Sequence, residues 1–436
     1  MLPFMFFPLL PLAFQPSDSS APGSSGTRPR TAVRAAAPRQ LRPGRARTTM
    51  PTSRKPATEV TRRGPSRPAR VLSQRALNRA LLERQLLLRR SKLSVPQVVE
   101  HLLGLQAQSP NPPYYGLWTR LESFRQEELA SRLMDRSLVR LVVMRGTIHL
   151  VTARDALLLR PLVQPMLDRA LYTGSAYGRN LHDVDMKALV AAGRALVEEQ
   201  PRTLTELGPA LGERWPGRDT VSLAQAIRLL VPLVQVPPRG IWGSGGNPTC
   251  TTLESWVGQP LDSAPSVDDV VLRYLAAFGP ASTQDIQAWF GLTRLGEVTE
   301  RLRPRLRTFV DEQGQELFDL PDAPRPDPET PAPVRFLPEF DNVLLSHADR
   351  TRIISDEDRK RIATRNGMVP GAILVDGFFH GIWKLEQRRG AATLRIEPFR
   401  KLSAQDRAAL TEEGAKLLTF AAPEATSHDL QFVRPG

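Results

Sequence analysis

Apolar side chains take up a regular spacing from Val71 onward, and three helices followed by a hairpin are predicted. Leucines recur at helical intervals between Ser73 and Arg89, and Ser94-Val95-Pro96-Gln97 is typical of a helix start with proline in its first turn. A third helix is expected over 126–136. The pattern of apolar and polar residues over 138–151 then predicts a β-hairpin that turns near Arg145-Gly146. A winged helix-turn-helix has this order of elements, helices first and a hairpin after them.

The same order recurs along the chain, at long and uneven spacing. We expect an α+β fold of three tandem winged helix-turn-helix modules, at 71–175, 176–262 and 263–322. The proline-rich stretch Pro321–Pro333 is typical of a linker or a domain-edge loop. Beyond it strands dominate, with a hairpin turn at Asp376-Gly377, so a small β-barrel closed by a C-terminal helix is predicted over 323–436.

Charge is spread unevenly over the 436 residues. Residues 1–70 hold 13 basic side chains against Asp18 and Glu59, which leaves a net charge of only +3 of the total +14 for the rest of the chain. The basic character is therefore weak evidence that the folded part binds nucleic acid. We expect 1–70 to be a disordered tail, outside the native protein if the start codon is misassigned.

Several kinds of segment and site are excluded by features that the sequence lacks. The apolar run Met1–Phe14 has no basic segment before it and is broken by proline, so neither a signal peptide nor a membrane span is expected. Cys250 is the only cysteine, which excludes a disulfide within the chain and fits a reducing cytoplasm. The glycine-rich segment Gly243–Gly246 is not followed by the Gly-Lys-Ser/Thr that ends a phosphate-binding loop. No cofactor or metal is predicted.

The segment Leu105-Gln106-Ala107-Gln108 combines polar side chains with an extended backbone. Pro110 disfavours helical geometry at Ser109, and Pro112 and Pro113 are expected to keep the chain extended. In an extended segment side chains two residues apart share a face, so Gln106 and Gln108 can direct two uncharged amides to one place. A polar loop at a helix end is the alternative interpretation of this pair.

Other polar or aromatic groups have simpler interpretations. Tyr115 and Trp118 are expected to pack in the core, because aromatic side chains mostly bury area. Asp341, His347 and Asp349 resemble an acid-base or metal trio, but their spacing matches no standard metal site. A structural role is the better interpretation of all three.

Several motifs together resemble the bacterial AlkZ/YcaQ-like winged-helix DNA glycosylase family. The resemblance covers roughly 71–420 and rests on five stretches: Gln106-Ala107-Gln108 before Asn111-Pro112-Pro113, Met144–Leu150, Phe278-Gly279-Pro280-Ala281 before Trp289, Leu337–Asn342, and Ser346–Arg350. It implies a C-shaped protein that binds DNA in a concave channel and hydrolyses the N-glycosidic bond of alkylated purines, with unhooking of some interstrand crosslinks. The family's catalytic motif is Gln-x-Gln or Gln-x-Asp, so the resemblance makes Gln106 and Gln108 the catalytic candidates.

The chemistry suits two amides, because an N7-alkylguanine is already cationic and leaves as a neutral base. The enzyme then has to orient a water and stabilise the sugar, which a weakly basic glutamine can help to do. Residues expected to contact double-stranded DNA are Arg140, Arg145, Thr147, His149 and Arg239, with phosphate contacts that ignore sequence. We expect a monomer.

Two other functions remain open at this point. A non-catalytic DNA-binding regulator would prefer one sequence over random DNA. However, no dimerisation heptad is evident, and the folded part is nearly neutral. A module that binds a small molecule or a protein would show no salt-dependent DNA binding.

Overall fold

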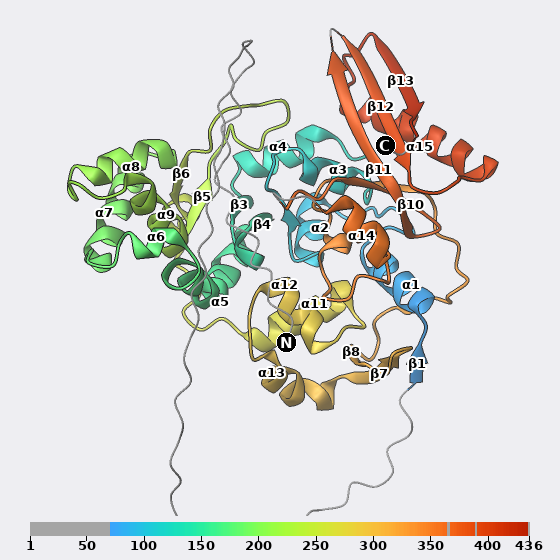
Figure 1. Cartoon of the computed structure of the whole chain (residues 1–436), viewed down its shortest axis with the longest axis horizontal. Helices are drawn as coiled ribbons and strands as arrows, with labels where there is room; N and C mark the ends of the chain where they lie inside the picture. Colours follow the sequence, from blue (N-terminus) through green and yellow to red (C-terminus); the bar gives the residue numbers. More distant parts are fainter. Residues whose placement is uncertain (1–69, 364–366, 389, 435–436) are drawn as a thin grey trace, which may run out of the picture. The chain divides into compact units, whose positions relative to one another are not determined.

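The computed structural model describes residues 70–363, 367–388 and 390–434 (Figure 1). The predicted tail lies outside these residues, except for Arg70. No helix in this part of the chain is both long and apolar enough to cross a membrane. The predicted module boundaries, and the C shape implied by the resemblance, stay predictions.

The first group of elements follows the expected order of helices and hairpin. Ser73 caps the first helix by accepting a hydrogen bond from the Ala76 N–H at 3.2 Å. The elements are β1 (Arg70–Leu72), α1 (Gln74–Arg84), α2 (Val95–His101), β2 (Leu105–Gln106), α3 (Pro112–Trp118), α4 (Gln126–Met134), β3 (Leu138–Val142), the 3-10 helix η1 (Met144–Gly146) and β4 (Ile148–Thr152).

Two helices differ from the sequence-based prediction. Pro112 and Pro113 were expected to keep the chain extended, but α3 begins at Pro112, because proline is tolerated in the first turn of a helix, where its missing N–H has no partner to lose. The 20-residue helix α5 (Ala153–Tyr172) was not predicted, and it contains Pro161 and Pro165. Its buried face, which includes Leu159 and Val163, packs into the core and outweighs the low helix propensity of proline.

The second group contributes its strands to the sheet of the first group. Its elements are α6 (Ala176–Arg179), α7 (Met186–Glu199), α8 (Leu204–Gly212), α9 (Thr220–Leu230), β5 (Leu233–Gln235), β6 (Cys250–Thr252) and α10 (Leu253–Val257). Five strands pair antiparallel in the order β2-β4-β3-β5-β6, and Figure 1 shows β5 and β6 beside β3 and β4. The two expected wings therefore form one continuous sheet.

The third group has its own small sheet. Its elements are α11 (Val267–Phe278), α12 (Thr283–Phe290), α13 (Leu295–Leu302), the 3-10 helix η2 (Arg303–Arg305), β7 (Arg307–Asp311) and β8 (Glu316–Asp319). The N-terminal strand β1 pairs parallel to β7, which gives the strand order β1-β7-β8. The first strand of the described chain thus completes a sheet that is built about 240 residues later.

The C-terminal strands form an open sheet. The elements are β9 (Arg335–Leu337), the 3-10 helix η3 (Asn342–Leu344), α14 (Asp356–Ile362), β10 (Gly371–Val375), β11 (Phe378–Arg388), β12 (Ala391–Pro398), α15 (Ala404–Ala421) and β13 (Ser427–Phe432). The order is β13-β12-β11-β10-β9, and among the described residues no pairing joins β13 to β9. The predicted closed barrel is therefore not found. The helix α15 packs against β9, β12 and β13 instead and buries the apolar face that closure would have covered.

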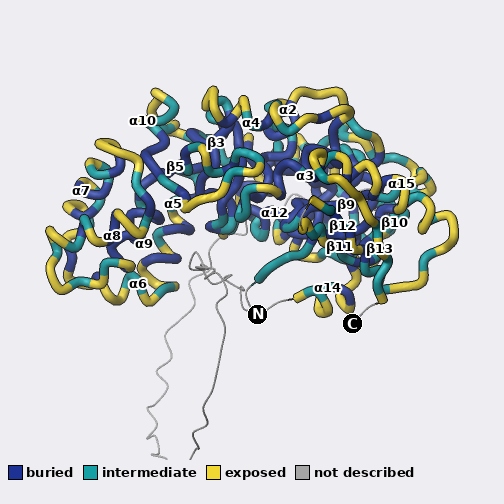
Figure 2. The backbone as a smooth tube through the Cα atoms, turned by 90° about the horizontal axis from the view of Figure 1, so that it is seen from above, coloured by how far each residue is buried: buried dark blue, intermediate teal, exposed yellow. Residues whose placement is uncertain are grey.

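Buried ion pairs link α1 and the segment just after α3 to residues far along the chain. Arg84 donates to both carboxylate oxygens of Asp319, at 2.7 and 2.9 Å, and neither side chain is exposed. Arg120 makes the same paired contact with Asp341, at 2.8 Å for each bond. Most buried apolar side chains of the described residues belong to one large core, and Figure 2 shows the buried stretches of backbone in dark blue.

Candidate functional site

The paired glutamines follow a tight turn that lays β2 against β4. Leu103 and Gly104 both have positive φ, at 54° and 93°. A Cβ on Gly104 would lie 2.6 Å from Val151 Cγ1 and 2.9 Å from the Leu150 carbonyl oxygen, so only glycine fits this close approach. The turn leads directly into β2, where Gln106 pairs with His149 across the ladder.

Gln106 is buried, and its side chain is bound by an arginine. Its Oε1 accepts a hydrogen bond of 2.7 Å from Arg145 Nη2. Arg145 lies in η1 with φ of 56°, donates from Nη1 to the Trp289 carbonyl at 3.1 Å and stacks on the Trp289 ring at 4.3 Å. Burial lowers the pKa of Arg145 to about 9, with a smaller contribution from Arg350. Arg145 therefore stays cationic at neutral pH.

His149 is fully buried beside this arginine. Its Nδ1 lies 3.1 Å from the Thr147 carbonyl and its Nε2 lies 3.3 Å from Arg145 Nη2. Burial and the Arg145 charge hold the pKa of His149 well below its usual value. The ring also meets the edge of Trp289, at a centroid distance of 6.0 Å. His149 is thus a neutral imidazole enclosed in the protein.

Gln108 engages the start of β4 through the backbone. Its Oε1 accepts a 3.2 Å hydrogen bond from the Ile148 N–H, and the Ala107 N–H donates to the Ile148 carbonyl at 2.7 Å. The Gln106 side chain therefore binds Arg145 in η1 and the Gln108 side chain binds the Ile148 backbone, but β2 ends at Gln106 and Gln108 lies in a bend, so the extended backbone was predicted correctly only for the first glutamine. Gln108 is half-buried, so it is the more accessible of the two.

Arg140 lies beneath the glutamine segment, and its side chain is only 1% exposed. Its Nη2 donates to the Ala107 carbonyl at 2.8 Å, while Nε and Nη1 have no partner in the described part of the chain. Burial lowers its pKa to about 10, helped by the charge of Arg239. Gly240 covers the guanidinium. Arg140 therefore supports the backbone between the two glutamines and is not at the surface where a DNA phosphate would lie.

The remaining predicted DNA contacts are partly accessible. Arg239 is half-buried in the loop between β5 and β6 and donates to the Gly246 carbonyl at 2.9 Å. Thr147 is half-buried, and its Oγ1 donates to the Met144 carbonyl at 3.1 Å. In the described part of the chain neither Arg239 nor Thr147 is hydrogen-bonded to a glutamine of the pair.

Sequence reasoning missed Trp289 as a member of this site. It comes from α12, 144 residues after Arg145 in the chain. Trp289 is fully buried, and its Nε1 has no hydrogen-bond partner among the described residues. Its place beside a family motif was the only signal in the sequence, and nothing there indicated that α12 packs on η1.

The aromatic residues after the glutamines pack as predicted. Tyr115 meets Trp242 and Trp383 edge-on, at centroid distances of 5.4 and 5.5 Å, and Trp118 stacks on Phe420 at 5.9 Å. This cluster joins α3 to the β5–β6 loop and to the C-terminal sheet and helix. It fixes the segment that follows the glutamines.

Asp341, His347 and Asp349 have separate structural partners. Asp341 is paired with Arg120, and His347 lies 2.9 Å from Ser346 Oγ and 3.1 Å from the Phe278 carbonyl. Asp349 accepts from the N–H and the hydroxyl of Thr351. No group of side chains in the described ranges could hold a metal ion. The predicted structural interpretation of the trio fits these contacts.

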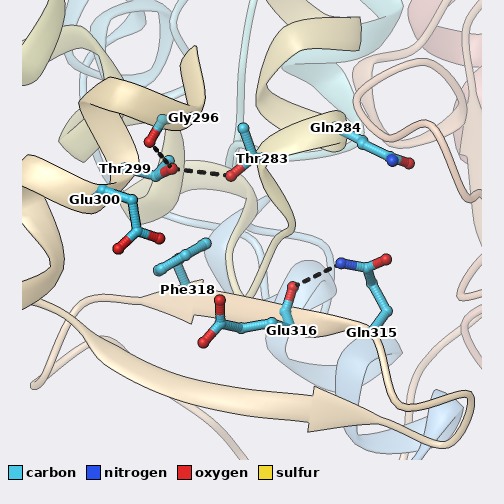
Figure 3. Close-up of a pocket in the computed structure, with 8 residues that line it drawn as sticks. All are labelled: Thr283, Gln284, Gly296, Thr299, Glu300, Gln315, Glu316 and Phe318. Atoms are coloured by element: carbon cyan, nitrogen blue, oxygen red, sulfur yellow. Dashed lines mark hydrogen bonds between the residues drawn. The ribbon is translucent and has the colours of Figure 1, made fainter. Parts of the chain in front are cut away.

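One cavity of about 300 Å³ lies elsewhere, in the third group of elements. Figure 3 shows its lining side chains coming from α12, α13 and the β7–β8 hairpin, and the lining contains none of the residues described above. Arg303 donates to both Glu300 and Glu316, so both carboxylates at this cavity are already paired with an arginine. The cavity is therefore a weaker candidate site than the glutamines.

Comparisons with known proteins agree on one family. The profile of the DNA glycosylase AlkZ-like family matches residues 99–420, which include both glutamines. The interstrand DNA cross-link repair glycosylase of Streptomyces sahachiroi is 26% identical over 353 residues, which cover 73% of this chain and 88% of the relative.

A solved structure supports the same assignment at the level of the fold. The Streptomyces sahachiroi DNA glycosylase AlkZ superposes with a TM-score of 0.68 at 20% identity, and the match covers 83% of this chain and 100% of that chain. The profile match alone spans most of the chain. The chain therefore belongs to the AlkZ-like DNA glycosylase family.

Proposed function

We propose that this protein is a monofunctional DNA glycosylase that hydrolyses the N-glycosidic bond of N7-alkylated purines and unhooks interstrand crosslinks made through such bases. The observation that carries the proposal is that Gln106 and Gln108 make their side-chain hydrogen bonds to two residues close together in the chain, Arg145 and Ile148. The relative from Streptomyces sahachiroi, named an interstrand DNA cross-link repair glycosylase, gives the substrate class its support.

Uncharged amides suit a leaving group that is already activated. In N7-alkylguanine the breaking bond returns its electron pair to a cationic ring, so the base leaves neutral without being protonated. Water adds to C1′ of the sugar, and its extra proton passes to solvent. The protein has to supply orientation and fixed dipoles, which together are worth several kcal/mol. Unmodified purines, which need a strong acid, should not react.

The surroundings of the glutamines also support hydrolysis by water. Among the described residues the glutamine oxygens are bound by Arg145 and by the Ile148 N–H, and neither of these groups is an amine that could form a covalent intermediate with the sugar. We propose that the three groups of helices and strands act as winged-helix modules on double-stranded DNA, and that the protein is a monomer. Phosphate contacts would make binding fall steeply with salt.

The test uses the full chain and a duplex with one N7-methylguanine, followed by alkaline cleavage of abasic sites. We expect product with the wild type and at least a hundredfold less with Gln106→Ala or Gln108→Ala, the size of loss seen when one fixed dipole is removed. Gln225→Ala is the matched control, because Gln225 is a buried glutamine whose Oε1 also accepts from an arginine, at 3.3 Å.

Two outcomes would contradict the proposal. Equal activity in all variants would remove the glutamines from the site. Absence of product with both methylated and crosslinked DNA, together with strong preference for one sequence, would favour the non-catalytic regulator.

A further inference from the structure

We propose that Arg145 is a positioning residue that fixes Gln106 as a hydrogen-bond donor toward the DNA substrate. The sequence suggested a phosphate contact for this arginine. The geometry points instead to a chain of hydrogen bonds that runs from the backbone through His149 and Arg145 to Gln106. The identity of the substrate rests on the proposed function, but the hydrogen-bond chain does not.

The chain of hydrogen bonds begins at a carbonyl oxygen, which can only accept. The Thr147 carbonyl can only accept, so the His149 Nδ1 that lies 3.1 Å away must carry the proton. A neutral imidazole has one proton, and burial lowers the pKa of His149 well below its usual value. Its Nε2 is therefore an acceptor, and the group 3.3 Å away that donates to it is Arg145 Nη2.

The same guanidinium nitrogen determines the orientation of Gln106. A guanidinium has no acceptor atom, so the glutamine must turn its oxygen toward Arg145, at 2.7 Å. The Nε2 of Gln106 then points away from the arginine, and the one side-chain hydrogen bond that Gln106 makes among the described residues uses its oxygen. Both N–H groups of this amide remain available to an oxygen or nitrogen of the substrate or of the attacking water.

Arg145 is itself held on two sides. Its Nη1 donates to the Trp289 carbonyl, and its guanidinium stacks on the Trp289 ring at 4.3 Å. No carboxylate pairs with it in the described ranges. Its charge therefore polarises the Gln106 amide and strengthens the two N–H donors.

The arrangement gives the glutamines different tasks. Gln106 has its oxygen occupied and offers donors. Gln108 has one lone pair bound by the Ile148 N–H at 3.2 Å and keeps a second lone pair to accept a hydrogen bond from water. In the proposed reaction Gln108 orients the water, and Gln106 stabilises the atom that becomes electron-rich.

The first test removes the donors or the residue that orients them. Gln106→Glu keeps the contact with Arg145 but replaces the amide NH2 by an oxygen, so its kcat should fall as far as in Gln106→Ala. Arg145→Met should lower kcat about 10- to 100-fold, the coupling expected within one hydrogen-bond network. In a Gln106→Ala background, Arg145→Met should have no further effect. Independent, multiplicative losses would overturn the proposal, and so would a Gln106→Glu variant as active as the wild type.

The protein contains a second arginine, stacked on a tryptophan in the same way, that serves as a matched control. Arg136 also has positive φ, of 66°, donates to the Trp256 carbonyl at 3.1 Å and stacks on the Trp256 ring at 4.1 Å. It lies outside the glutamine site, so Arg136→Met should keep the wild-type kcat. A loss of kcat in Arg136→Met as large as in Arg145→Met would mean that stacking alone explains the effect.

A second measurement does not depend on activity. Nitrogen-15 chemical shifts of His149 in the full chain should show protonated Nδ1 and unprotonated Nε2, with no titration between pH 6 and 8. In Arg145→Met the pKa of His149 should rise, because a neighbouring cation is gone. A His149 protonated at Nε2 in the wild type would overturn the hydrogen-bond chain. If the protein shows the expected chemical shifts but no glycosylase activity, the chain of hydrogen bonds is supported and only the proposed function is refuted.

Discussion

Replacing Asp341 by asparagine tests whether this buried carboxylate is structural or chemical. Asp341 accepts two hydrogen bonds of 2.8 Å from Arg120, and neither side chain is exposed. Asp341→Asn leaves the guanidinium buried without a counter-ion, which costs about 3–5 kcal/mol. For a folded unit of roughly 370 residues the entropy of unfolding is about 0.8 kcal/mol per kelvin, so Tm should fall by about 4–6 °C.

The assay is calorimetry of the full chain, with glycosylase activity measured at 20 °C on the same samples. The control is Glu412→Gln, which breaks the exposed pair with Lys416, whose side chains are 54% exposed for the lysine and 73% for the glutamate. That pair is worth less than about 1 kcal/mol, so Tm should move by about 1 °C or less. An Asp341→Asn protein with unchanged Tm but lost activity would refute the structural interpretation and make Asp341 part of the chemistry.

Two further predictions concern stability. His149 and His347 are buried, and burial holds both pKa values well below the usual 6.5. The unfolded chain therefore binds more protons, and stability that is present above pH 6.5 should be lost below it, by roughly 1 kcal/mol per histidine per pH unit; a Tm that is equal at pH 7.5 and 5.5 would contradict this. Gly240→Ala would place a Cβ 2.6 Å from Arg140 Nη1 and should cost about 1–3 kcal/mol in urea denaturation, whereas Gly243→Ala, with positive φ but no atom within 4 Å, should cost only about 1 kcal/mol.

Local signals predicted much of the secondary structure. The helices α7 and α11 follow from local sequence, because Asp185 and Ser266 cap their first turns and the apolar spacing behind them is regular. The hairpin turn at Asp376-Gly377 is confirmed by its two residues of positive φ, at 47° and 80°. These features depend on residues near each other in the chain.

The site itself could be predicted only in part. The short strand that ends at Gln106 follows from local sequence. However, the contact of Gln106 with Arg145 depends on how η1 is packed, and the support from Trp289 depends on a helix far along the chain. An arginine beside a glycine turn is usually exposed, so the sequence indicated a phosphate contact for Arg145. In the structure Arg145 is half-buried and its guanidinium is held by Trp289 and Gln106, a contact that the spacing of apolar residues does not predict.

The position of α1 has a consequence for synthesis of the protein on the ribosome. Its Arg84 needs Asp319 as a counter-ion, 235 residues later, and β1 needs β7 as its partner. At about 5–20 residues per second, Arg84 must remain solvated for roughly 10–50 s after it is made. The first helix of the folded part therefore docks among the last, and a nascent chain that stops before Asp319 would expose the apolar face of α1 to chaperones and proteases.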